Sequence, residues 1–87
     1  MHEASLMIDL MRKIDDIIED QRAERAVAVK VKLGALSHMS PSHFEEHFDE
    51  ASAGTRAEGA RLELETVDDI DDPHAQDILL EAVEVEM

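Results

Sequence analysis

The sequence contains no cysteine, tryptophan or tyrosine, and only two phenylalanines and three glycines. Without cysteine there can be neither a disulfide framework nor a zinc site with thiolate ligands, so any metal site must use nitrogen and oxygen donors. Long hydrophobic runs are also lacking, since no apolar stretch approaches the roughly 20 residues that span a bilayer. The opening MHEASLMIDLMRKIDD carries charges where a signal peptide needs an apolar block. We therefore expect a cytoplasmic protein.

Positive charge is scarce as well, because 8 basic residues stand against 22 acidic ones and the formal net charge is −14. Such a field repels phosphate backbones and anionic lipids, which argues against nucleic acid and membranes as partners. Only Lys13, Lys30 and Lys32 are lysines. An acidic, lysine-poor surface suits a high-salt cytoplasm, where salt screens the self-repulsion of a small fold. The composition thus favours a halophilic source.

Two segments have the period of a helix. Between Ala4 and about Glu24, apolar residues recur every three or four positions, which predicts a helix of roughly 30 Å with one buried face. That face would carry Leu6, Met7, Leu10, Met11, Ile14, Ile17 and Ile18. The second helix is marked by its ends: Ser40 and Pro41 are typical of an N-cap and a first helical residue, and Gly54 of a helix end. Its inward residues would be Phe44, Phe48 and Ala51.

Three segments alternate with the two-residue period of a strand that has one buried face. The first is AVAVKVKLG, in which we expect Val27, Val29, Val31 and Leu33 to point inward. The second runs from Ala60 to Val67 and the third from Ile78 to Met87. The order α-β-α-β-β predicts an α/β (α+β) fold, a two-layer sandwich with two helices on one face of a three-stranded mixed sheet.

The remaining segment, DDIDDPHAQD at 68–77, is an acidic connector in which like charges and Pro73 oppose regular structure. Its carboxylates lack the alternation and the glycine of an EF-hand loop, so a solvated loop is the better interpretation. The exposed edges of the sheet could support a dimer, and the connector could permit exchange of the last strand. We treat residues 1–87 as a single domain.

The amino terminus is the first candidate metal site. With histidine at position 2, the terminal amine, the intervening amide nitrogen and the imidazole can close five- and six-membered chelate rings in one plane. Planar nitrogen donors suit Ni(II) or Cu(II), and the gain in coordination energy drives the amide proton off. A Met-His start is a weak signal by itself, and the alternative is an ordinary unstructured end.

The second candidate is His43-Phe44-Glu45-Glu46-His47, which matches the H-x-x-E-H pattern of inverted zinc peptidases. On a helix the two histidines share a face within chelating reach. The more ordinary interpretation is two histidines at the rim of a buried stripe, with an auxiliary metal contact as the alternative and a small metallohydrolase as a distant third. His38 and His74 lie in expected loops, and either could add a ligand. Met7 and Met11 have helical spacing and are expected in the core.

Several segments together resemble a known family. MHEASLMIDL, VKLGALSHMSPSHF and GTRAEGARLELETV are similar, in order, to the nickel-binding domain of HypA/HybF, the nickel chaperones of [NiFe]-hydrogenase maturation, and DILLEAVEVEM resembles the last strand of that domain. The resemblance implies a nickel metallochaperone without catalytic activity. It also implies that Met1, His2 and Glu3 bind nickel through the amine, backbone nitrogen and the histidine side chain.

The same resemblance implies partners and one departure. The family delivers nickel together with the GTPase HypB, so a HypB-like GTPase and the hydrogenase large subunit are the expected partners, with urease as another client in some organisms. Members occur as monomers or strand-exchanged dimers. The family inserts a zinc domain with two CxxC pairs where this chain has only residues 68–77, so we expect no structural zinc. The alternative function is a protein–protein interaction module of the same fold that has lost nickel delivery.

The charge imbalance predicts salt-dependent stability. Raising KCl from about 0.1 M to about 3 M shortens the Debye length from about 10 Å to below 3 Å and should raise the urea midpoint of unfolding, because repulsion among the carboxylates is screened. Circular dichroism at a series of KCl concentrations measures that midpoint. Equal midpoints at both salt concentrations would refute the inference of a halophilic surface.

Overall fold

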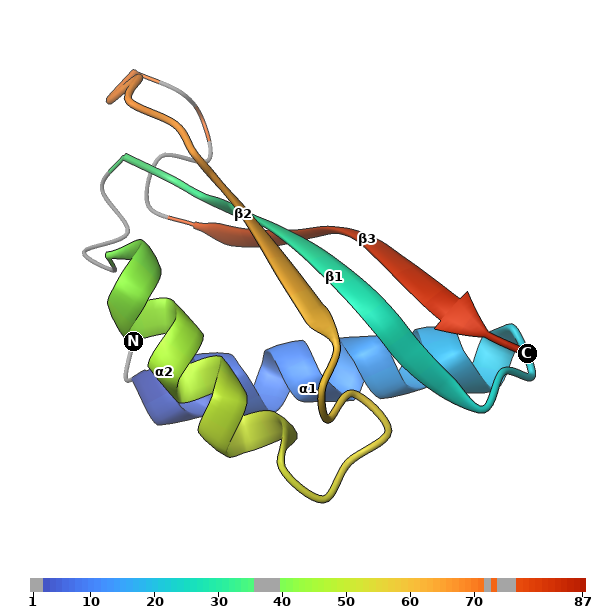
Figure 1. The fold of residues 1–87 in the computed structure, drawn as a ribbon. Coiled ribbons are helices and arrows are strands. Elements are labelled where there is room, and N and C mark those ends of the chain that lie inside the picture. The colour runs from blue at the N-terminus through green and yellow to red at the C-terminus, as the bar shows by residue number, and fades with distance from the viewer. Residues whose placement is uncertain (1–2, 36–39, 72, 74–76) are drawn as a thin grey trace.

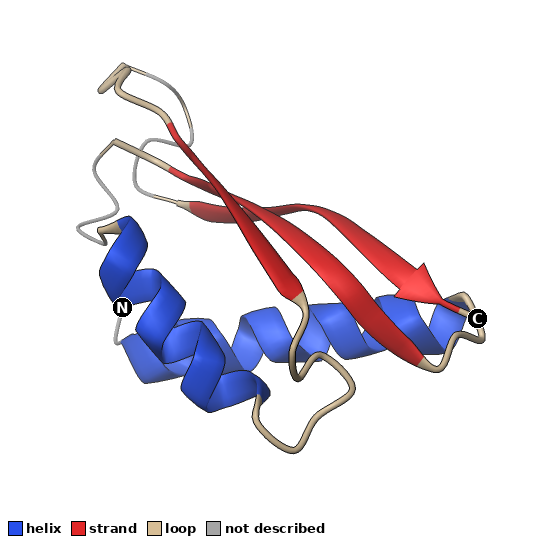
Figure 2. Ribbon diagram, viewed as in Figure 1, coloured by secondary structure: helices blue, strands red, loops and turns tan. Residues whose placement is uncertain are grey.

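The computed structural model describes residues 3–35, 40–71, 73 and 77–87. The elements follow the predicted order α-β-α-β-β: α1 (Glu3–Asp20), β1 (Arg25–Leu33), α2 (Pro41–Ser52), β2 (Arg61–Thr66) and β3 (Ile78–Glu86). Both helices lie on the same side of the three strands, with α2 packed across the N-terminal half of α1 (Figure 1). Figure 2 shows the resulting two layers, one of helices and one of strands. The predicted α+β sandwich is therefore confirmed.

The sheet is mixed and has β1 in its centre, in the order β2-β1-β3. β1 is parallel to β2 and antiparallel to β3, so that Val31 pairs with Leu64 on one side and with Leu80 on the other. The parallel pair requires a crossover, which α2 provides. The core therefore forms where the inward residues of β1 meet both helices.

Two β-bulges change the side-chain alternation that the sequence predicts. Between β1 and β3 the register shifts at Val27 and again at Glu81, and each of these residues has no paired partner on the other strand. The first bulge makes the predicted inward orientation of Val27 wrong, because Val27 is only half-buried whereas Ala26 joins the core cluster. After the bulge the predicted phase holds for Val29 and Val31, which have no exposed surface.

The core is built from aliphatic side chains and the two phenylalanines. Phe44 and Phe48 are 0% and 1% exposed, and their ring centroids lie 6.5 Å apart, so the rings pack together under the sheet. The stripe of α1 faces inward as predicted, with Met7, Leu10, Ile14 and Ile18 buried. Its other members, Leu6, Met11 and Ile17, are half-buried. The members of the core cluster that come from α1 and β1 are Met7, Leu10, Ile14, Ile18, Ala26, Val29, Val31 and Leu33. Because no ionisable group is among the residues found buried in the described part of the chain, hydrophobic burial dominates its stability.

Helix α1 ends at Asp20, four residues before the predicted boundary near Glu24. The end is a Schellman motif: the N–H of Ala23 donates to the carbonyl of Ile18, and the N–H of Arg22 to that of Glu19, both at 3.0 Å. Arg22 has the left-handed φ of 55° that this motif requires. The prediction was too long because the residue at this position is usually glycine, and here no glycine marks the end.

Helix α2 has the ends that the sequence predicts. The Ser40 hydroxyl accepts a hydrogen bond from the N–H of His43 at 3.3 Å, and Pro41 is the first helical residue. After Ala53 the chain leaves the helix through Gly54, which has a φ of 78°. The cap and Pro41 therefore fix the residue at which α2 begins, and with it which residues share each face of the helix.

The loop that follows α2 is tied to α1 and β1. Its Arg56 carbonyl accepts the N–H of Ala26 at 2.9 Å, and its guanidinium lies 2.7 Å from the Glu19 carboxylate. A hydrogen bond to Asp15 is the main cause that raises the pKa of Arg56 above its usual value, with Glu19 adding to it. The loop thus closes one end of the sandwich.

The outer face and edges of the sheet carry ion pairs. Arg61 reaches Glu63 on its own strand and Glu84 on β3, at 3.2 and 3.8 Å, and Arg25 bonds Glu86 at 2.8 Å. These exposed pairs contribute little to stability but keep the face polar.

Strand exchange and dimerisation stay predictions. In the part of the chain that the structure describes, neither helix combines the length and apolar character needed to cross a bilayer.

Arg22 generates a test of the α1 end. Arg22→Gly should stabilise the protein by about 0.5–1 kcal/mol, because glycine adopts a positive φ without the steric cost of a Cβ, a gain partly offset by the larger entropy of the unfolded chain. Arg22→Ala is the matched control, since it removes the same exposed side chain but keeps the Cβ. Urea unfolding measures both, and equal stability of the two variants would contradict the strained conformation.

Candidate functional site

The predicted nickel ligands are at the start of the chain. Met1 and His2 lie outside the described residues, and Glu3 is the first residue of α1. The backbone N–H groups of the first four residues of a helix have no acceptor within the helix. A helix that begins at Glu3 therefore leaves the backbone nitrogens at its start outside the helical hydrogen-bond ladder. The two other histidines that could add a ligand, His38 and His74, also lie outside the described residues.

The second candidate, the histidine pair of α2, is brought together as its four-residue spacing predicts. The Nε2 atoms of His43 and His47 lie 2.9 Å apart, and the ring centroids are 4.6 Å apart at an interplanar angle of 41°. Which nitrogen donates depends on the tautomers of the two rings. His43 is exposed and His47 is half-buried, so the pair faces outward although Phe44 and Phe48 of the same helix are buried.

His47 also faces α1. It lines a pocket of about 470 Å³ together with the α1 residues Met7, Ile8 and Met11 and the α2 residue Glu50. Met7 is buried and Met11 packs against the core, which confirms their predicted structural role. The pair therefore sits at the rim of the helix–helix interface, with apolar side chains on one side and solvent on the other.

The peptidase reading of H-x-x-E-H finds no support in this arrangement. In the described ranges, no cluster of three or more His, Cys, Asp or Glu side chains has the geometry to hold a metal ion. A zinc peptidase needs three protein ligands and an open position for water. The two histidines by themselves supply a chelate but not that catalytic centre.

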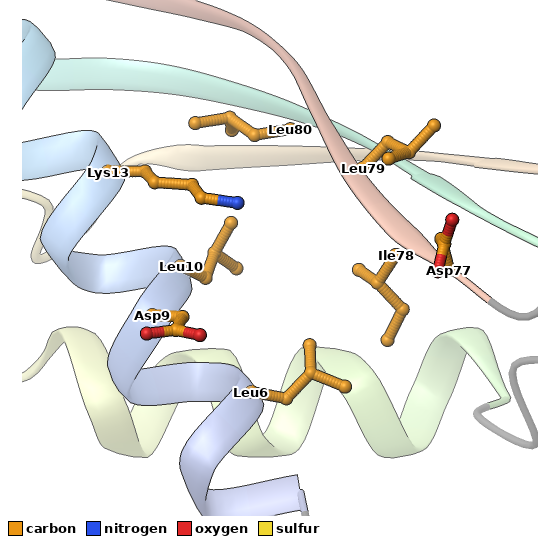
Figure 3. A pocket seen from close by; sticks show the side chains of 8 residues that line it. All are labelled: Leu6, Asp9, Leu10, Lys13, Asp77, Ile78, Leu79 and Leu80. Carbon is orange, nitrogen blue, oxygen red and sulfur yellow. The ribbon is translucent and has the colours of Figure 1, made fainter. Parts of the chain in front are cut away.

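A groove that the sequence did not predict lies between α1 and the start of β3. It has a volume of about 460 Å³ and is lined by Leu6, Asp9, Leu10 and Lys13 of α1 and by residues 77–80. In Figure 3, Leu6, Leu10 and Ile78 form its apolar part, while Asp9, Lys13 and Asp77 stand around it. Sequence reasoning missed it because its walls are about seventy positions apart in the chain and no local pattern connects them.

Both ends of the acidic connector are fixed beside the end of β1. The N–H of Val67 donates to the carbonyl of Leu33, and the N–H of Gly34 donates to the carbonyl of Asp77, each at 3.0 Å. Val67, which follows β2, and Asp77, which precedes β3, are therefore both hydrogen-bonded to the two consecutive residues Leu33 and Gly34 at the end of β1. Because the entropy cost of closing a loop rises only slowly with its length, a longer segment between 67 and 77 is compatible with the same sheet.

Comparison with known proteins identifies a family match. The model of the family described as "Hydrogenase/urease nickel incorporation, metallochaperone, hypA" matches residues 1–70. The hydrogenase maturation factor HypA of Methylocella silvestris is 37% identical over 67 residues, which are 77% of this chain and 59% of that protein. HypA of Roseiflexus sp. is 40% identical over 67 residues, 77% of this chain and 54% of that protein. The chain spans somewhat more than half the length of these curated relatives.

A solved structure extends the likeness to the last strand. The solution structure of the Ni metallochaperone HypA from Helicobacter pylori superposes with a TM-score of 0.82 and covers 99% of this chain and 98% of that chain. The sequence identity is 16%, so this match speaks for the fold alone. Because it extends beyond residue 70, it includes β3 in the common architecture.

The N-cap of α2 generates a test of how the histidine pair is positioned. Ser40→Ala removes the hydroxyl that accepts the His43 N–H and should cost about 1 kcal/mol, lowering the melting temperature by roughly 4–8 °C. Ser42→Ala is the matched control, since Ser42 is exposed on the first turn and alanine favours the helix there. Thermal unfolding followed by circular dichroism compares them, and equal losses in both variants would contradict the cap.

Proposed function

Because the chain belongs to the HypA family, we propose that it is a nickel metallochaperone that binds Ni(II) and delivers it for maturation of [NiFe]-hydrogenase. The observation that carries the proposal is the family match over residues 1–70, which begins at the Met-His-Glu segment itself. The curated relatives bear the name hydrogenase maturation factor, which favours hydrogenase as the client. Nickel is the cargo here, and the chain is proposed to have no catalytic activity.

The proposed ligands are the terminal amine of Met1 and two groups of His2, its backbone nitrogen and its imidazole. The backbone nitrogen of Glu3 is a further contributor. Nitrogen donors in one plane satisfy the square-planar preference of Ni(II), whereas zinc gains nothing from planarity. Deprotonation of backbone nitrogens is feasible at this position because α1 begins only at Glu3, so no helical hydrogen bond is lost. Each ligand must release its proton, so affinity should rise with pH and acidification should favour release.

Delivery requires partners that accept the cargo. We propose a HypB-like GTPase and the hydrogenase large subunit, as the family assignment suggests.

The acidic connector 68–77 is proposed to stand where longer family members carry their zinc domain, since β2 and β3 meet it beside the end of β1. With no cysteine in the chain, structural zinc of the thiolate kind is not part of the proposal. The negative surface is proposed to suit a salt-rich cytoplasm, and strand exchange through β3 is the proposed route to a homodimer.

Calorimetric titration with Ni(II) tests the amino-terminal site. The unmodified chain should bind one tightly held ion, and His2→Ala or acetylation of the Met1 amine should weaken binding at that site at least tenfold, because each change removes a donor from the chelate. His74→Gln is the control histidine substitution and should leave the affinity unchanged. Square-planar Ni(II) should also give a visible absorption band that both changes abolish.

Two results would contradict this assignment. Unchanged Ni(II) affinity after His2→Ala would show that the ion binds elsewhere. Affinity no greater than that of a short Met-His peptide, together with a partner that still co-purifies, would instead favour the alternative interaction module without nickel delivery.

A further inference from the structure

We propose that His43 and His47 form a second metal-binding site on α2, which takes a borderline divalent ion such as Ni(II) or Cu(II). The proposal rests on the α2 residues and does not depend on the amino-terminal ligands. Two imidazole nitrogens from one helix supply a bidentate chelate. The helix backbone holds both donors before the ion arrives, so less side-chain entropy is lost on binding.

The distance between the two nitrogens carries the proposal. The Nε2 atoms are 2.9 Å apart, the separation of two donors that share a proton or a metal ion. With metal–nitrogen bonds of about 2.05 Å, this separation corresponds to a donor–metal–donor angle of about 90°. That is the angle between adjacent ligands in square-planar and octahedral complexes, whereas tetrahedral zinc needs nitrogens about 3.4 Å apart. The observed spacing therefore favours Ni(II) and Cu(II) over Zn(II).

The charges around the pair favour a cation. Glu46 and Glu50 each follow a histidine by three positions, so they are its neighbours on the helix surface. Glu50 lines the same pocket as His47. Their carboxylates offset the partial positive charge of the helix N-terminus, near which His43 lies. The formal charge of −14 adds a long-range attraction for divalent cations.

The local structure explains why the pair is held in place. Ser40 caps the helix at the N–H of His43, and Phe44 and Phe48 anchor the same two turns in the core. His47 is half-buried and lines the same open pocket as the apolar side chains of Met11 and Ile8 of α1. The two histidines provide two ligands of the ion, and water or a partner's side chain completes its coordination. Such a site exchanges its ion more readily than a closed one.

The experiment uses the full chain with its amino terminus disabled by His2→Ala and one added glycine before Met1. In this background we expect Cu(II) and Ni(II) titrations to show one remaining site that binds Zn(II) more weakly than Cu(II). Adding His43→Gln or His47→Gln should lower the affinity of that site at least tenfold. Glutamine preserves helix propensity and both rings are at least partly exposed, so the fold should persist, as circular dichroism can verify.

Matched controls locate the site. His74→Gln in the same background should leave binding unchanged, and trace Cu(II) should broaden the proton resonances of His43 and His47 before those of His38 and His74. Equal broadening of all four histidines, or unchanged affinity after His43→Gln, would overturn the proposal and leave the 2.9 Å contact as a shared proton. The amino-terminal site is tested separately in chains that retain both α2 histidines, so either proposal can fail while the other stands.

Discussion

The central position of β1 is the constraint on which the other elements depend. This strand is hydrogen-bonded to β2 on one edge and to β3 on the other, while its inner face carries Val29 and Val31 with no exposed surface. A chain of this size can bury few side chains completely, so a strand paired on both edges and covered by two helices concentrates the available hydrophobic stabilisation. Both helices, the two flanking strands and the ends of the connector are therefore positioned relative to one nine-residue segment.

Much of this arrangement was predictable from the sequence because hydrophobic period directly reflects burial. The five elements and their order follow from the change between helical and alternating patterns, and Ser40-Pro41 gave the start of α2. Two features were not predictable in the same way. The bulge at Val27 arises from pairing with β3, some 57 residues later, and the end of α1 depends on Arg22 adopting a conformation that glycine usually supplies. Local propensity does not determine the orientation of Val27 or the residue at which α1 ends. Pairing with β3 determines the first, and the cap at Arg22 determines the second.

The candidate sites differ in how much the sequence alone could predict. The shared face of His43 and His47 follows from their spacing, but the 2.9 Å contact depends on the rotamers that the surrounding helices allow. The proposed amino-terminal ligands come from the chemistry of a Met-His start and from the resemblance to the family, and Met1 and His2 lie outside the described residues. The groove between α1 and β3 had no local pattern that could reveal it, because it exists only when distant segments meet.

Separation of the core from the proposed metal donors fits the proposed role of a metal carrier. In a protein that folds around its metal, the binding free energy is part of the folding free energy, and release of the ion unfolds the chain. Here the described core consists of aliphatic and phenylalanine side chains, and the described histidines lie outside it. Loss of an ion from such positions leaves the hydrophobic contacts of β1, α1 and α2 in place. Binding and release can then occur without loss of the fold, because stability and metal affinity rest on different residues.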